Sequence, residues 1–180
     1  MAGTARLSQD HMTALCALEV LSLITDRLEQ YGNADGNDID MVLRFFRNIA
    51  HPCLDNTERW LLRPFLEAGI NPAEQDRLGA AVACHRQVKG LLDELENCYR
   101  QRRIQEFVSK ARRYAALFGD LIFDEERFIA ALLSPRARHD GVEQILARFD
   151  QAEDSVALQA RSAAPTLRRL EAKYVNPHCI

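Results

Sequence analysis

Apolar residues recur along this chain at alternating spacings of three and four, the pattern of helices that bury one face. Repeats of this kind predict four long helices over about 8–31, 38–68, 72–99 and 104–133. Glycine- and proline-containing breaks at 32–37 and 69–75, and a basic break at 100–103, separate them. The stripe of the first helix consists of Leu7, His11, Ala14, Leu18, Leu21, Thr25 and Leu28.

No stretch alternates Val, Ile or Thr with polar residues as a half-buried strand would. We therefore predict an all-α fold. Four long helices with short connections form an up-down-up-down four-helix bundle, which we place at residues 1–134. The segments GVEQILARF and TLRRLEAKYV predict further helices in 135–180. We expect this C-terminal extension to pack on the bundle or to form a homodimer with a partner subunit.

The second predicted helix changes its buried face part of the way along. Pro52 interrupts it, because proline removes a backbone hydrogen bond and bends a helix. Before Pro52 the stripe consists of Ile39, Val42, Phe46 and Ile49. After Pro52 we expect it to consist of His51, Asp55, Glu58, Leu62 and Phe65.

Composition and charge narrow the class of protein. The 180 residues are 47% hydrophobic and 27% charged, with a net charge of −3, so we expect one folded domain without bulk affinity for nucleic acid. A run of about 18 apolar residues is missing, so we expect no membrane span. The first residues lack the apolar segment of a secretion signal, and we expect a cytoplasmic protein with five reduced cysteines.

Three of the five histidines, His11, His51 and His85, fall on three different predicted helices. Asp55 follows His51 by four residues, and Asp120 and Asp124 repeat that spacing on the fourth helix. Residues four apart share a helix face. Imidazole and carboxylate groups converging from several helices suit iron, manganese or zinc.

A plainer interpretation stays open for each of these residues. A histidine in an apolar stripe is commonly a core residue with a satisfied ring. Asp120 and Asp124 stand in an acidic run that is typical of a solvated face. Glu58 is in phase with His51 but is more simply a surface residue paired with Arg59 or Arg63.

These motifs resemble the hemerythrin-like (HHE) family, whose members are four-helix bundles with a non-haem di-iron site. The resemblance covers about 7–133 and rests on Asp10-His11, AHPCLD at 50–55, CHRQVKGLLDEL at 84–95 and DLIFDEERFIAAL at 120–132. It departs from the family pattern where Ala50 replaces a histidine, where Asp55 and Asp124 replace glutamates, and where Asp120 replaces a histidine.

The resemblance implies two non-haem iron ions, or manganese or zinc in their place. His11, His51, Asp55 and Asp124 would hold one ion and His85 with Asp120 the other, Asp55 and Asp124 bridging the two. It also implies binding or sensing of dioxygen, nitric oxide or iron. The alternative is a metal-free helical module that binds a protein partner. Catalysis has less support, although Tyr114 lies within two turns of Asp120, because the sequence has no HExxH motif, phosphate loop or nucleophile elbow.

Overall fold

The computed structural model describes residues 2–68, 72–132, 140–153 and 157–175, and in these ranges it consists of helices and short connections without a strand. The predicted all-α fold class is confirmed. No helix within these ranges is both long and apolar enough to cross a membrane.

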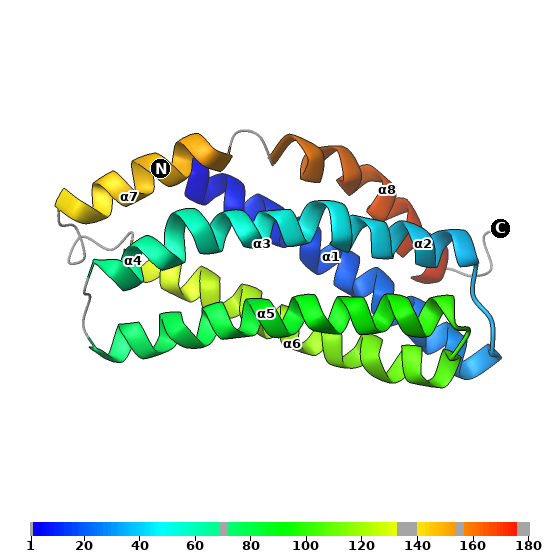
Figure 1. Ribbon diagram of the computed structural model, residues 1–180. Coiled ribbons are helices and arrows are strands. Elements are labelled where there is room, and N and C mark those ends of the chain that lie inside the picture. The colour runs from blue at the N-terminus through cyan, green and yellow to red at the C-terminus, as the bar shows by residue number, and fades with distance from the viewer. Residues whose placement is uncertain (1, 69–71, 133–139, 154–156, 176–180) are drawn as a thin grey trace.

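Residues 2–68 and 72–132 form three long helices and one interrupted helix (Figure 1). The three long ones are α1 (Ala2–Tyr31), α5 (Pro72–Arg100) and α6 (Ile104–Leu132). The interrupted one consists of α2 (Gly36–Phe45), the π-helical turn η1 (Phe46–Ala50), α3 (His51–Thr57), a second π-helical turn η2 (Glu58–Leu62) and α4 (Arg63–Glu67). The C-terminal part contains α7 (Asp140–Glu153) and α8 (Ala157–Val175).

Helix α6 packs against both α5 and α1, and α1 also carries α7 and α8 on another side (Figure 1). The two C-terminal helices therefore lie on the body of the same chain. Phe149 of α7 joins an apolar cluster with Leu61 and Phe65, while Leu167 and Leu170 of α8 join the main core cluster. His139 and His178 lie outside the described residues.

The predicted stripe of the first helix is confirmed, since all seven of its members are buried. The helix starts earlier than predicted, at Ala2 instead of about Ser8. Ser8 consequently lies inside the helix, where its hydroxyl donates to Glu126 Oε2 at 3.0 Å. This contact connects the first turns of α1 with α6.

The two π turns explain how the second predicted helix changes its buried face. His51 donates its backbone N–H to Phe46 five residues back and precedes Pro52, and Arg63 bonds to Glu58 and precedes Pro64. Proline crowds the carbonyl four residues before it, and a wider turn relieves that crowding. Each π turn adds one residue and so rotates the following side chains by about 100°.

The phase change predicted at Pro52 is confirmed, and three members of the predicted stripe after it, His51, Leu62 and Phe65, are buried. Leu54, Thr57 and Leu61 are buried, whereas Asp55 is exposed. The extra residue of η1 accounts for the exposure of Asp55, because it rotates the residues of α3 relative to a continuous α-helix.

The basic break after α5 is a tight cap built without glycine. Arg102 adopts the left-handed conformation (φ 57°), Arg102 N–H bonds to Tyr99 O, and Arg103 N–H bonds to Cys98 O. This is the hydrogen-bond pattern of a Schellman motif, in which glycine usually occupies the left-handed position. The cap turns the chain from α5 directly into α6.

Candidate metal centre

One buried carboxylate lies between two buried histidines from different helices. Glu125 of α6 accepts a hydrogen bond from His85 Nε2 of α5 at 2.8 Å. Its other oxygen lies 3.1 Å from Nε2 of His11 on α1. All three side chains are at least nine-tenths buried. We call His11, His85 and Glu125 the His–Glu cluster.

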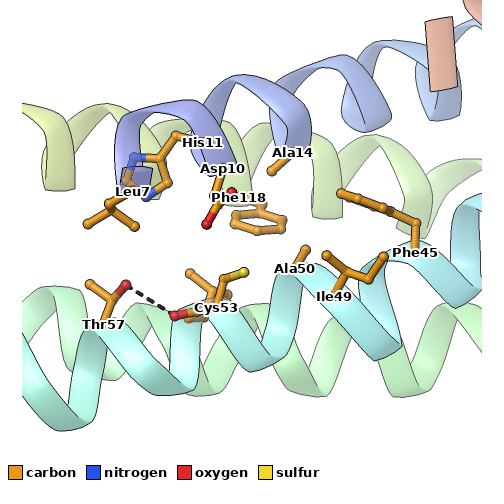
Figure 2. A pocket seen from close by; sticks show the side chains of 11 residues that line it. Leu7, Asp10, His11, Ala14, Phe45, Ile49, Ala50, Cys53, Thr57 and Phe118 are labelled. Carbon is orange, nitrogen blue, oxygen red and sulfur yellow. Dashed lines mark hydrogen bonds between the residues drawn. The ribbon is translucent and has the colours of Figure 1, made fainter. Parts of the chain in front are cut away.

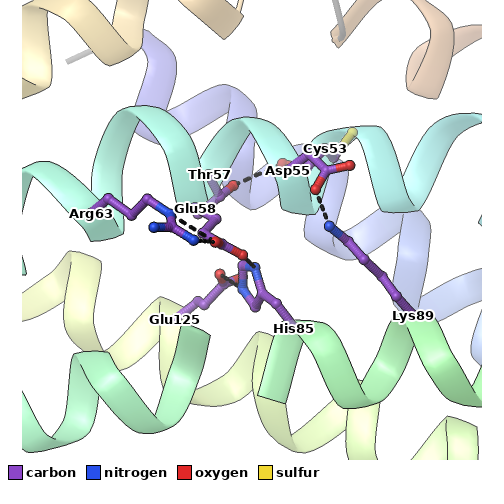
Figure 3. A network of polar contacts seen from close by, with 8 residues as sticks. All are labelled: Cys53, Asp55, Thr57, Glu58, Arg63, His85, Lys89 and Glu125. Carbon is purple, nitrogen blue, oxygen red and sulfur yellow. Dashed lines mark hydrogen bonds and ion pairs between the residues drawn. The ribbon is translucent and has the colours of Figure 1, made fainter. Parts of the chain in front are cut away.

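Two further carboxylates flank the His–Glu cluster. His11 Nδ1 donates to Glu126 Oε1 at 2.6 Å. Glu58 Oε2 lies 3.4 Å from Nδ1 of His85, on the opposite side of that ring from Glu125 (Figure 3). Arg63 donates to Glu58 at 2.6 Å and holds this carboxylate from the solvent side. Four helical segments, α1, η2, α5 and α6, thus supply the five groups.

The charges in this region stabilise one another. Burial alone would lower the pKa of His11, but the neighbouring carboxylates of Glu125 and Glu126 outweigh it and raise the pKa to about 9. Burial would raise the pKa of Glu125, but the neighbouring rings of His11 and His85 outweigh it and lower the pKa to about 2. The result is an anionic Glu125 carboxylate beside a protonated His11 ring.

Three buried atoms of the His–Glu cluster have no hydrogen-bond partner. His11 Nε2, His85 Nδ1 and Glu125 Oε2 are buried and form no hydrogen bond, although each lies within ion-pair distance of an oppositely charged group. A buried polar atom normally has a partner. As arranged, however, no group of three or more His, Cys, Asp or Glu side chains among the described residues is disposed to hold a metal ion.

Of the six predicted ligands, only His11 and His85 lie in the His–Glu cluster. His51 is buried elsewhere, with its Nε2 3.0 Å from the hydroxyl of Tyr114. Asp55 is exposed and pairs with Lys89 of α5, one turn along that helix from His85 (Figure 3). Asp120 and Asp124 are both exposed on α6.

Sequence reasoning passed over Glu125 and gave Glu58 a surface role. A signal for Glu125 was present, because the stripe through Tyr114 and Leu121 continues at a spacing of four to residue 125. The signal for Glu58 was weaker, because its orientation depends on the two π turns. Glu58 does pair with Arg63, as the plainer interpretation expected, and it contacts His85 as well.

A small cavity lies beside His11, between α1, α6 and the segment from η1 to α3. It measures about 10 Å³, room for about one water-sized molecule, and is walled mainly by apolar side chains (Figure 2). Asp10 and His11 supply its ionisable groups, while Phe118, Ala50 and Leu54 form part of its wall.

Comparisons of the chain with models of protein families, with curated proteins and with solved structures find no match.

Proposed function

We propose that the chain is a hemerythrin-like metalloprotein: a four-helix bundle of α1, α2–α4, α5 and α6 that binds iron, or manganese or zinc, at the His–Glu cluster. The observation that carries the proposal is the position of Glu125, whose two oxygens face ring nitrogens of His11 and His85 from two other helices. A bridging carboxylate between two ions, each with one histidine, would use these same groups.

The donor spacings fit such a site. Two donor atoms that bind one ion at about 2.1 Å and at right angles are separated by about 3 Å. The two contacts of Glu125 with the histidines measure 3.1 and 2.8 Å. Glu58 would be the second bridging carboxylate in place of the predicted Asp55, and Glu126 a further ligand beside His11. Glu58 would have to turn from Arg63 to reach such an ion.

The surroundings of the site suit a small ligand. Bound iron would supply a redox-active centre with affinity for diatomic molecules. The protein would contribute the cavity beside His11, whose apolar wall excludes bulk water and whose volume of about 10 Å³ admits only a very small molecule. We therefore propose that the ligand sensed or bound is dioxygen or nitric oxide, or that iron itself is the signal.

Metal analysis of paired variants tests the ligand set. The unaltered chain, produced with added iron, should contain up to two ions per chain by mass spectrometry and show charge-transfer absorption in the near ultraviolet. Glu125→Gln and Glu58→Gln should each lower the metal content about tenfold or more, since each removes a ligand from the site.

The matched controls are Asp124→Asn and Asp55→Asn, which change a neighbouring exposed carboxylate by the same chemistry. Both should keep the full metal content. Metal loss in the aspartate variants, with retention in the glutamate variants, would favour the ligand set predicted from the sequence motifs. Unaltered protein that stays below about a tenth of an ion per chain after anaerobic loading with Fe(II) would refute the metal function.

One observation favours a second candidate function, a metal-free helical module. The two histidines already lie at hydrogen-bond distance from carboxylates. The buried charges of the core are therefore compensated without a metal. In that case the metal analysis gives background values for every variant, and Glu125→Gln lowers only the stability of the fold.

A further inference from the structure

A second buried histidine contact lies away from the His–Glu cluster. The hydroxyl of Tyr114 on α6 and Nε2 of His51 at the start of α3 are 3.0 Å apart, and both side chains are buried. Their rings are 6.1 Å apart between centroids. Among the described residues, neither His51 nor Tyr114 forms an ion pair with the His–Glu cluster. The metal site proposed above therefore does not use this pair.

Aromatic rings surround the phenol. Phe46 packs edge-on at 5.0 Å from Tyr114 and Phe118 at 5.7 Å, as measured between ring centroids. Phe118 also contacts His51 at 6.3 Å. These side chains exclude water from the phenol, so a proton leaving Tyr114 has His51 as its neighbouring base.

The protonation states are those that such a transfer requires. Burial, together with the charges of Arg47 and Lys89, lowers the pKa of His51 to about 4, so its ring is neutral at pH 7. Burial also raises the pKa of Tyr114 well above its usual value. The phenol therefore donates its O–H to an unprotonated Nε2, and the proton is carried by Nδ1 in that tautomer.

We propose that Tyr114 and His51 form a proton-coupled redox pair. A one-electron oxidant takes one electron from the phenol, the O–H bond breaks, and the proton moves to Nε2 of His51. The products are a neutral tyrosyl radical, an imidazolium and the reduced oxidant. Transfer of the proton follows because an oxidised phenol is a far stronger acid than an imidazolium ion.

Phe118 connects this pair with the metal site proposed above. Its ring packs on Tyr114 and lines the small cavity that His11 also lines (Figure 2). An oxidised metal ion at the His–Glu cluster is the class of oxidant that this arrangement suits, and this identification of the oxidant rests on the proposed function. The pair itself does not require the metal, and it can be tested without one.

Flash oxidation of the metal-free full chain tests the pair. Photogenerated tris(bipyridine)ruthenium(III) serves as the one-electron oxidant, and electron paramagnetic resonance and transient absorption detect tyrosyl radicals. Subtracting the signal of Tyr114→Phe removes radicals on the other tyrosines. The difference should be a tyrosyl radical that forms more slowly in D₂O, because a proton moves with the electron.

The decisive variant is His51→Gln, whose amide oxygen still accepts the hydrogen bond of Tyr114 but is not a base. We expect it to slow formation of the Tyr114 radical about a hundredfold. A merely structural hydrogen bond predicts no such loss in this variant. Equal rates in the unaltered chain and in His51→Gln, no isotope effect in the unaltered chain, or no radical that depends on Tyr114 would each overturn the proposal.

Discussion

His51 is a neutral histidine in an apolar core, and its burial lowers the folding stability at low pH. The unfolded chain binds a proton to this ring below about pH 6.5, whereas in the folded chain the pKa is about 4. A lowered pKa in the folded state gives a contribution to stability that is complete above pH 6.5 and is lost as the pH falls toward 4.

Replacing His51 should therefore flatten the pH dependence of folding stability. Between pH 7 and pH 4.5 the unaltered chain should lose about 2 kcal/mol more unfolding free energy than His51→Gln does. Urea unfolding at the two pH values measures this difference, and carboxylates that titrate in the same range cancel in the comparison. Parallel pH profiles for the two proteins would contradict the assignment.

Glu125 and Asp124 show how finely a helix separates neighbouring side chains. Adjacent residues on a helix point about 100° apart, and here one carboxylate is buried between two histidines while the other is exposed. Neighbouring residues of one acidic run can therefore differ in burial. The position of each residue relative to the apolar stripe decides which carboxylate reaches the core.

At the scale of the element, the cap after α5 is strained at one residue. Arg102 occupies a left-handed conformation that a residue with a Cβ adopts only at a cost. Arg102→Gly should raise the unfolding free energy by about 1 kcal/mol and the melting temperature by about 3 °C. Calorimetry measures the shift, and Arg100→Gly, at an ordinary helical position, should instead destabilise the protein.

The helices themselves could be predicted from the sequence because their apolar stripes are regular. All seven predicted stripe residues of α1 are buried, and so are Val88, Leu92 and Leu95 of α5. His11 and His85 could be placed in the core for the same reason. The orientation of Asp55 could not be predicted, because the sequence does not show that a proline widens the turn before it.

The carboxylates of the site were harder to predict than its histidines. A histidine between apolar residues stands out, but a glutamate in an acidic run looks like a surface residue. Glu125 is held in the core by His11 on α1 and His85 on α5, which lie 114 and 40 positions before it in the sequence. Such partners become neighbours only through tertiary packing, which local patterns do not contain.

At the scale of the molecule, α8 is attached to α2 by a buried carboxylate. Asp38 accepts hydrogen bonds from Lys173 Nζ and from the Tyr174 hydroxyl, both at 2.7 Å. Asp38 is buried, so removal of its donors leaves a charge without compensation.

The double variant Lys173→Met with Tyr174→Phe should loosen α8 from the body of the chain. We expect the unfolding free energy to fall by about 2 kcal/mol and amide exchange in α8 to accelerate, while α5 and α6 keep their protection. Hydrogen exchange followed by mass spectrometry measures both. Arg169→Met, on an exposed face of the same helix, is the control and should leave exchange unchanged. Uniform acceleration in every helix would contradict local attachment.

The π turns before Pro52 and Pro64 make the length of this segment as important as its composition. Deleting one residue within Phe46–Ala50 would restore an ordinary α-helical turn and rotate every following side chain by about 100°. Glu58 would then leave the ring of His85, and the apolar face of α3 would turn away from the core. Related chains should therefore tolerate substitutions in this segment far better than insertions or deletions of a single residue.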